Sequence, residues 1–228
     1  MFRAGVEGAN KPLDRLGEPE PVEANQGWIE HAEGTSEPPI TAFGASWAVP
    51  APPQRKEELL LGLGIGLQER GRSTAEGLLY VVLQWGRYEG KGGAQWGLAC
   101  WYTPGHGQPL VQSTPVENIP SGHTVKASIV FEDGRWVCQA GTAGQQPTVL
   151  TVHHDLALHW AAALLEAHRL PGGPITAEDL PSSSETVFHG VGVKQSRLSR
   201  ELDWKGEVDQ APPGRHVTTG RSEISLLY

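Results

Sequence analysis

The stretch HTVKASIVFEDGRWVCQA, residues 123–140, contains the strongest local turn signal in the chain. Asp133-Gly134 separates two short runs rich in β-branched and aromatic residues, and an Asp-Gly pair is typical of a tight β-hairpin. Similar short apolar runs recur on both sides, between clusters of Gly, Pro and polar residues, which indicates many short strands. We expect strands at 27–31, 40–49, 59–67, 77–85, 94–103, 123–132, 135–140, 147–154, 185–194 and 216–228, with a short piece at 109–118.

Composition supports the same fold class. The 228 residues include 29 Gly and 18 Pro, and about ten strands in succession predict an all-β protein, a two-sheet antiparallel β-sandwich of the concanavalin or jelly-roll type. We expect one sandwich domain over 27–228. Residues 1–26 are polar, acidic and rich in Pro and Gly, and we expect a flexible arm there.

Charge and hydropathy exclude several classes of partner. The net charge is −8 and the sequence has no basic stripe, so we expect no nucleic-acid partner. It has no apolar run of about 18 residues that would span a membrane, and we expect a soluble, acidic protein. The N-terminus lacks the apolar core of a secretory signal, so the sequence leaves the localisation open.

The window DLALHWAAALLEAHRL, 155–170, does not fit the strand pattern clearly. Its Ala and Leu content, with Asp155 as N-cap and Pro171 as a stop, favours a helix. A period of two also fits, and then Trp160, Ala162, Leu164 and Glu166 share one face.

Three motifs give weak signals for cofactors or metals. Gly62, Gly64 and Gly66 lack the spacing of a dinucleotide fingerprint and favour close packing within a sheet. The stretch VHHDLALH, 152–159, matches no zinc pattern and favours a polar turn at a strand end. Cys100 and Cys138 lie beside Trp residues within apolar runs and favour buried thiols or one disulfide. We therefore expect no cofactor and no metal.

Two polar side chains stand out within apolar stretches. Gln84 comes near the end of GLLYVVLQWG, 77–86, and Glu166 is the only acidic residue between Ala157 and Leu170. Such groups are costly to bury without partners, so each either reaches the surface or faces a functional site. Tyr80 and Gln84 share a face if 77–85 is a strand.

The order of several segments resembles the glutamic peptidases of the eqolisin family. VVLQWG resembles the family segment that carries the catalytic glutamine, and AAALLEAHRL the segment that carries the catalytic glutamate. The other matching segments are FGASWAVP (43–50), LLLGLGIGL (59–67), WGLACWYTP (96–104), IPSGHTVKASIVFE (119–132), GRWVCQ (134–139) and VFHGVGVK (187–194).

The resemblance implies a lectin-like sandwich in which 155–170 contributes a strand. It further implies that Glu166 is the general base and Gln84 the oxyanion donor of an endopeptidase that acts on peptide or unfolded protein through an activated water. Substrate would contact Tyr80, Trp96, Trp101 and Trp160. The resemblance also implies a secreted protein.

Two points refine this hypothesis. Near pH 3 the 18 Lys and Arg with the 9 His would give a charge approaching +27, and because this charge repels itself we expect activity at mildly acid pH. The alternative is a non-catalytic, lectin-like sandwich that binds peptide or carbohydrate on a concave, Trp-rich face.

Overall fold

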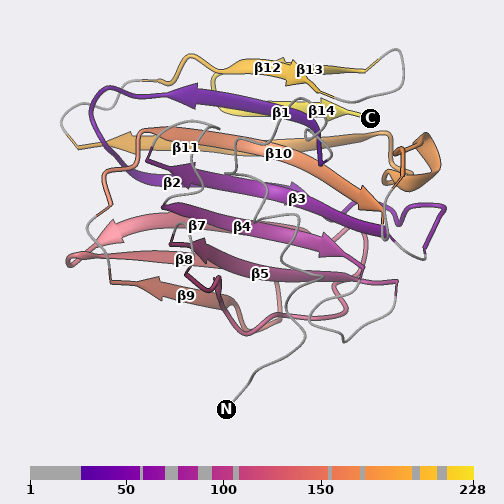
Figure 1. Ribbon diagram of the computed structural model, residues 1–228, viewed down its shortest axis with the longest axis horizontal. Helices are drawn as coiled ribbons and strands as arrows, with labels where there is room; N and C mark the ends of the chain where they lie inside the picture. The colour runs from indigo at the N-terminus through magenta and orange to yellow at the C-terminus, as the bar shows by residue number, and fades with distance from the viewer. Residues whose placement is uncertain are drawn as a thin grey trace.

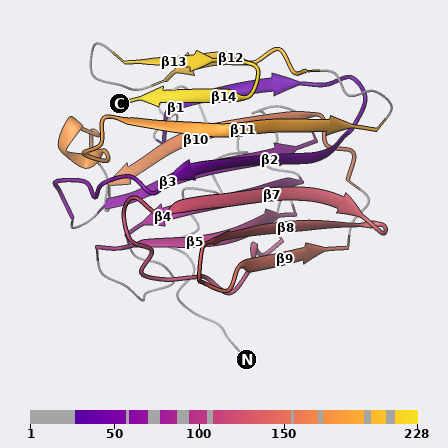
Figure 2. The same cartoon turned by 180° about the vertical axis from the view of Figure 1, so that it is seen from behind.

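The protein is a β-sandwich of two antiparallel sheets packed face to face (Figures 1 and 2). The computed structural model describes residues 27–56, 59–69, 77–86, 94–104, 108–153, 156–169, 173–196, 201–209 and 215–228. The expected arm, 1–26, lies outside the described residues. Over the described part of the chain, no helix is long and apolar enough to cross a membrane.

The first sheet lies in front in Figure 1 and has the strand order β12-β1-β10-β3-β4-β5-β6. Its strands are β1 (Trp28–Thr35), β3 (Leu59–Gln68), β4 (Leu78–Trp85), β5 (Trp96–Thr103), β6 (Val111–Gln112), β10 (Trp160–Arg169) and β12 (Lys205–Val208).

The second sheet lies in front in Figure 2 and has the strand order β13-β14-β11-β2-β7-β8-β9. Its strands are β2 (Ile40–Ala48), β7 (Thr124–Glu132), β8 (Arg135–Thr142), β9 (Thr148–Val152), β11 (Glu185–Gln195), β13 (His216–Thr219) and β14 (Glu223–Leu227). One 3-10 turn, η1 (Ala177–Asp179), follows β10 in the chain.

The hairpin between β7 and β8 confirms the turn expected from the sequence. Glu132 pairs with Arg135, and the two residues between them both have positive φ, 50° at Asp133 and 75° at Gly134. Two consecutive positive φ angles are typical of a type I′ turn, which glycine tolerates without steric cost.

The helix favoured by composition over 155–170 is wrong, and the strand implied by the family resemblance is confirmed. β10 lies between β1 and β3 in the first sheet, and Trp160 to Ala167 are buried along it without a break. Tertiary packing overrides the helix propensity of Ala and Leu at this position.

The strands also differ from expectation in other places. The segment 216–228 forms two strands rather than one, joined by a turn in which Gly220 N donates to Glu223 O at 2.7 Å. β1 extends to Thr35, four residues beyond the expected end. β12 was not expected at all, since its residues KGEV are all exposed and carry no apolar alternation.

The hydrophobic core lies between the sheets. Large side chains from both sheets fill it, and Trp47 packs on Phe188 with ring centroids 5.0 Å apart. Cys100 and Cys138 are buried in this core as free thiols.

Glu30 is fully buried, and burial raises its pKa to about 8 although the positive charge of Arg215 opposes the shift.

Candidate functional site

Gln84 and Glu166 face the same side of the first sheet, away from the core. Each is the register partner of Gly62 on the strand between them, Gln84 from β4 and Glu166 from β10. Directly paired residues of neighbouring strands point to the same face. Two strand spacings place their backbones about 10 Å apart, a separation that two long side chains can span.

The Glu166 side chain leans over Gly62, toward the strand that carries Gln84. A β-carbon at Gly62 would lie 2.6 Å from Glu166 Oε1 and 2.8 Å from its Cγ. Only glycine leaves this space, so the carboxyl group occupies the position that a side chain on β3 would fill.

The Glu166 carboxyl group is buried and incompletely paired. The residue is 3% exposed, and its Oε2 atom has no hydrogen-bond partner among the residues that the structure describes. His168 approaches this carboxyl group, with its Nε2 4.0 Å from Oε2. That separation is too long for a hydrogen bond and leaves room for one bridging water or substrate atom.

His168 is a site residue that the sequence analysis missed. It follows Glu166 by two positions on β10, so both side chains project from the same face of the strand. Its Nε2 atom is also buried without a hydrogen-bond partner in the described part of the chain. If 160–170 is taken as a strand, its period of two places His168 on the same face as Glu166, and this pattern could have identified the residue.

Tyr80 lies on the same face and is buried there. The Oη atom has no hydrogen-bond partner among the described residues. Burial raises the pKa of Tyr80 well above its usual value, and the negative charge of Glu166 raises it further. Tyr80 therefore keeps its proton and can act only as a neutral hydrogen-bonding group.

The four residues expected to contact substrate do not all reach this face. Tyr80, Trp101 and Trp160 belong to one buried apolar cluster on the outer side of the first sheet. Trp96 instead faces the core between the sheets, as does its register partner Trp85. Gly97, the next residue, pairs with Gln84 on the outer face, and neighbouring residues of a strand point to opposite faces. Its indole packs edge-on against Trp85 at 5.3 Å.

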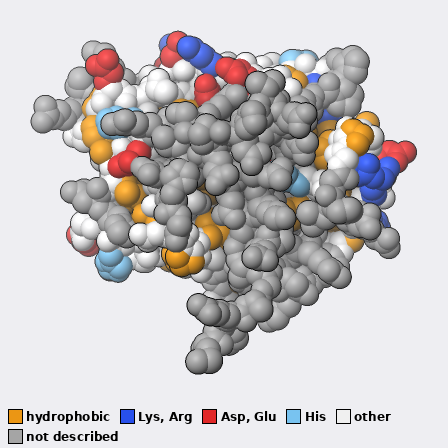
Figure 3. All heavy atoms as spheres, viewed as in Figure 1, with side chains coloured by type: hydrophobic (Ala, Val, Ile, Leu, Met, Phe, Trp, Pro, Cys, Tyr) orange, Lys and Arg blue, Asp and Glu red, His pale blue; other side chains and the backbone are white. Residues whose placement is uncertain are grey.

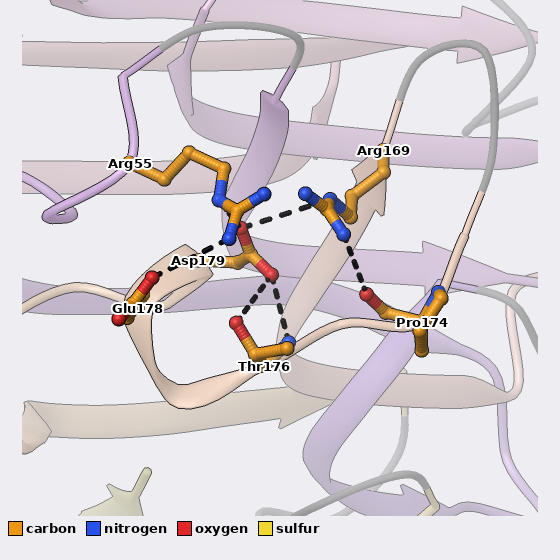
Figure 4. A network of polar contacts seen from close by, with 6 residues as sticks. All are labelled: Arg55, Arg169, Pro174, Thr176, Glu178 and Asp179. Atoms are coloured by element: carbon orange, nitrogen blue, oxygen red, sulfur yellow. Dashed lines mark hydrogen bonds and ion pairs between the residues drawn. The ribbon is translucent and has the colours of Figure 1, made fainter.

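A charged network holds the end of β10 that carries Glu166 (Figure 4). Asp179 is fully buried, and its Oδ1 lies 3.0 Å from Arg55 Nε and 3.8 Å from Arg169 Nε. Its Oδ2 accepts hydrogen bonds from the backbone N and the hydroxyl of Thr176 at 2.7 and 2.8 Å. The buried carboxylate is thus paired with two guanidinium groups and Thr176, and it contacts β10 at Arg169, three residues after Glu166.

Other candidate motifs have structural roles. A β-carbon at Gly64 would lie 2.0 Å from the backbone oxygen of Val81, so this glycine permits close strand packing, as expected. His159 Nδ1 lies 2.9 Å from Ser36 O. His154 and Asp155 of the same motif lie outside the described residues.

A hollow of about 660 Å³ lies elsewhere, on the outer face of the second sheet. Lys126, Ser128 and Gln139 on β7 and β8 line part of it. The two sheets turn their outer faces in opposite directions (Figures 1 and 2), so this hollow is remote from Gln84 and Glu166.

Solved structures share the fold of this protein. The chain aligns with Scytalido-glutamic peptidase, crystallised with a peptide-based transition-state analogue, over 89% of its own length and 98% of the other chain. The TM-score is 0.59 and the sequence identity 13%. The fold resembles that of a glutamic peptidase. The sandwich implied by the sequence resemblance is therefore confirmed at the level of the fold.

A second, weaker likeness is to toad ovary galectin in complex with thio-digalactose. It covers 60% of this chain and 98% of the galectin, with a TM-score of 0.38 and 11% identity. No protein-family profile matches the sequence. No curated protein matches it either.

Proposed function

We propose that the protein is a glutamic-type endopeptidase in which Glu166 and Gln84 act across Gly62. One observation carries the proposal: two polar side chains from the flanking strands share one register position and one face, with a glycine between them. A base and an oxyanion donor must lie on the same side of the scissile bond, each within hydrogen-bond reach of it.

Each residue has a distinct role in this mechanism. The Glu166 carboxylate accepts a proton from a water whose oxygen attacks the peptide carbonyl carbon. The Gln84 amide N–H donates to the oxyanion that forms on the carbonyl oxygen. When the C–N bond breaks, Glu166 returns the proton to the leaving amine. The reaction consumes one water and regenerates the carboxylate.

Substrate access is part of the proposal. Gln84 is 6% and Glu166 is 3% exposed, so a peptide reaches them only when the outer face of the first sheet becomes open. The buried Tyr80, Trp101 and Trp160 side chains lie on this face, and they supply apolar contact surface for an extended peptide. We expect unfolded proteins and peptides as substrates.

Cleavage of an unfolded protein between pH 3 and pH 7 tests the proposal. We expect wild-type activity at mildly acid pH, and Glu166→Gln should lower the rate about 10²–10⁴-fold because it removes the base. Gln84→Ala should cost about 10²–10³-fold through loss of one oxyanion donor. Glu132→Gln, at the exposed end of β7 in the other sheet, is the matched control and should retain full activity.

Two outcomes would count against the peptidase. Equal rates for wild type and Glu166→Gln would assign the cleavage to another group or to a contaminant. A folded wild type that cleaves nothing, but binds peptide or carbohydrate in a way that Trp101→Ala weakens, would assign the face to recognition alone.

A further inference from the structure

A second polar cluster lies on the outer face of the first sheet, at the edge where β12 pairs with β1. His31 and Glu207 are register partners on these two antiparallel strands. Glu33 follows His31 by two residues and so projects from the same face. Figure 3 shows acidic and basic side chains gathered along the edge that β12 forms.

The three side chains converge on one another. His31 Nε2 lies 3.9 Å from Glu33 Oε2 and 3.8 Å from Glu207 Oε2, and one ligand atom of each residue lies within 4.8 Å of the others. These separations are too long for hydrogen bonds. Ligands of one tetrahedral zinc ion, each about 2.1 Å from the metal, lie roughly 3.4 Å apart, so small side-chain adjustments would close the site.

The surrounding residues orient the candidate ligands. The His31 ring is fully buried, and its Nδ1 lies 2.9 Å from Asp209 Oδ2, which fixes the ring and directs Nε2 toward the two glutamates. Trp160 Nε1 donates a hydrogen bond to Glu33 Oε2 at 2.9 Å. A carboxylate behind the histidine and a donor behind the ligating carboxylate are the outer-shell partners that protein metal sites use.

Charge and access also suit a cation. Glu33, Glu207 and Asp209 bring three carboxyl groups to one imidazole ring. They outnumber the single positive charge of Lys205, the exposed cross-strand neighbour of Glu33. The side chain of Glu207 is 47% exposed and that of Glu33 is 22% exposed, so an ion can enter from solvent. One nitrogen and two oxygen ligands suit Zn²⁺ better than the oxygen-only preference of Ca²⁺ or Mg²⁺.

We propose that His31, Glu33 and Glu207 bind one Zn²⁺ ion, with water completing the coordination. The ion would join β12, a four-residue edge strand with all of its residues exposed, to the rest of the sheet. The role is structural and is separate from the proposed chemistry at Glu166, which lies on the other side of Leu164 along β10. The site is independent of whether the protein is a peptidase.

Zinc titration of the full chain, first treated with EDTA and then dialysed, tests the site by calorimetry and thermal unfolding. We expect one Zn²⁺ per chain, a rise in Tm on binding, and no comparable effect of Mg²⁺ or Ca²⁺. Glu207→Gln should weaken zinc binding at least 10-fold and remove the Tm rise. Asp209→Asn should weaken it by about 10–100-fold, the usual effect of losing an outer-shell partner.

Two further variants separate this site from other binding. Glu223→Gln removes the carboxylate of an exposed pair, 3.0 Å from His189, and should bind zinc as wild type does. Glu166→Gln should also bind normally, which excludes the Glu166–His168 pair as the site. The proposal fails if wild type shows no saturable binding. It also fails if Glu207→Gln and Glu223→Gln bind zinc equally well, because the uptake is then a general property of the acidic surface.

Discussion

The two sheets of the sandwich differ in how deeply their outer faces are buried. In β7, β8 and β9 of the second sheet burial alternates, and in β8 every second residue from Trp136 to Thr142 is buried. In the first sheet β3, β4 and most of β10 are buried at every position. Alternation is typical of a sheet with one solvated face, and continuous burial of a sheet covered on both. The central strands of the first sheet thus have a buried outer face, and Gln84 and Glu166 there belong to a low-dielectric site.

The same contrast separates the two candidate binding surfaces. The hollow over Lys126 and Gln139 is formed by partly exposed polar residues on the second sheet. The Gln84–Glu166 pair lies within a buried layer that also holds Tyr80 and His168. Electrostatic interactions are stronger in such a layer than at the solvated surface, which is why we assign the chemistry to the first sheet.

The largest expected effect concerns Leu164 and Leu165, neighbours on β10 that face opposite sides of the first sheet. Both are buried, at 2% and 0% exposure. Each change to Ala should lower the free energy of unfolding by about 2–5 kcal/mol, whereas Val149→Ala on the second sheet, at 47% exposure, should cost less than about 0.5 kcal/mol. Denaturant unfolding measures all three. If Leu164→Ala costs as little as Val149→Ala, the outer face is solvated and the comparison fails.

Gly62→Ala should affect activity more than stability. The new β-carbon would collide with the flexible end of Glu166, 2.6 Å away, and displace the carboxyl group from Gln84. We expect a loss of about 100-fold in cleavage rate, since misplacing a catalytic group by about 1 Å has effects of that size. Gly66→Ala is the matched control, because its β-carbon would meet nothing closer than 3.4 Å. Equal activity of the two variants would show that the position of Glu166 over Gly62 is unimportant.

Tyr80→Phe tests whether the buried Tyr80 hydroxyl makes a stabilising hydrogen bond. Because the Tyr80 hydroxyl has no partner among the described residues, removing it should leave the free energy of unfolding unchanged or raise it by about 1 kcal/mol. Thermal or denaturant unfolding of the two proteins measures this. A loss of more than about 1 kcal/mol would mean that the hydroxyl makes a stabilising hydrogen bond in solution.

The smallest effect concerns the core thiol Cys100. Burial raises its pKa to about 12, although a hydrogen bond from Ser113 opposes the shift. At pH 8 only about one thiol in ten thousand would be ionised, so iodoacetamide should leave the folded protein unmodified and alkylate the unfolded chain. The Cys100 thiol ionises at a lower pH in the unfolded chain than in the folded protein. The free energy of unfolding should therefore fall as the pH rises from the ordinary thiol pKa toward 12. Rapid alkylation of the folded protein, detected by mass spectrometry, would show that the core opens easily.

The sequence predicts much of the fold because local signals and segment order agree. The Asp133-Gly134 turn, the short apolar runs and the family resemblance all indicate an antiparallel sandwich. The helix signal in 155–170 misleads because packing in a strand that is buried on both faces overrides the helix propensity of Ala and Leu. The unbroken apolar runs at 59–67 and 77–85 already indicate such strands, since a half-solvated strand would alternate.

The candidate site is only partly visible in the sequence. Gln84 and Glu166 stand out as polar residues in apolar stretches. That both lie beside Gly62 depends on how the strands pair, and local sequence patterns do not specify this pairing. Trp96 was expected at the site and faces the core, because the register of β5 decides its side of the sheet. The His31 cluster was missed because Glu207 lies on a short exposed strand far along the chain.

The most direct test of the central assignment is a crystal structure of the protein with a peptide-based transition-state analogue. We predict that its tetrahedral centre lies over Gly62, with the oxyanion about 2.7–3.1 Å from the Gln84 amide nitrogen and a second oxygen within hydrogen-bond distance of Glu166. An analogue bound instead in the hollow over Lys126 and Gln139, with Gln84 and Glu166 still buried, would contradict the assignment.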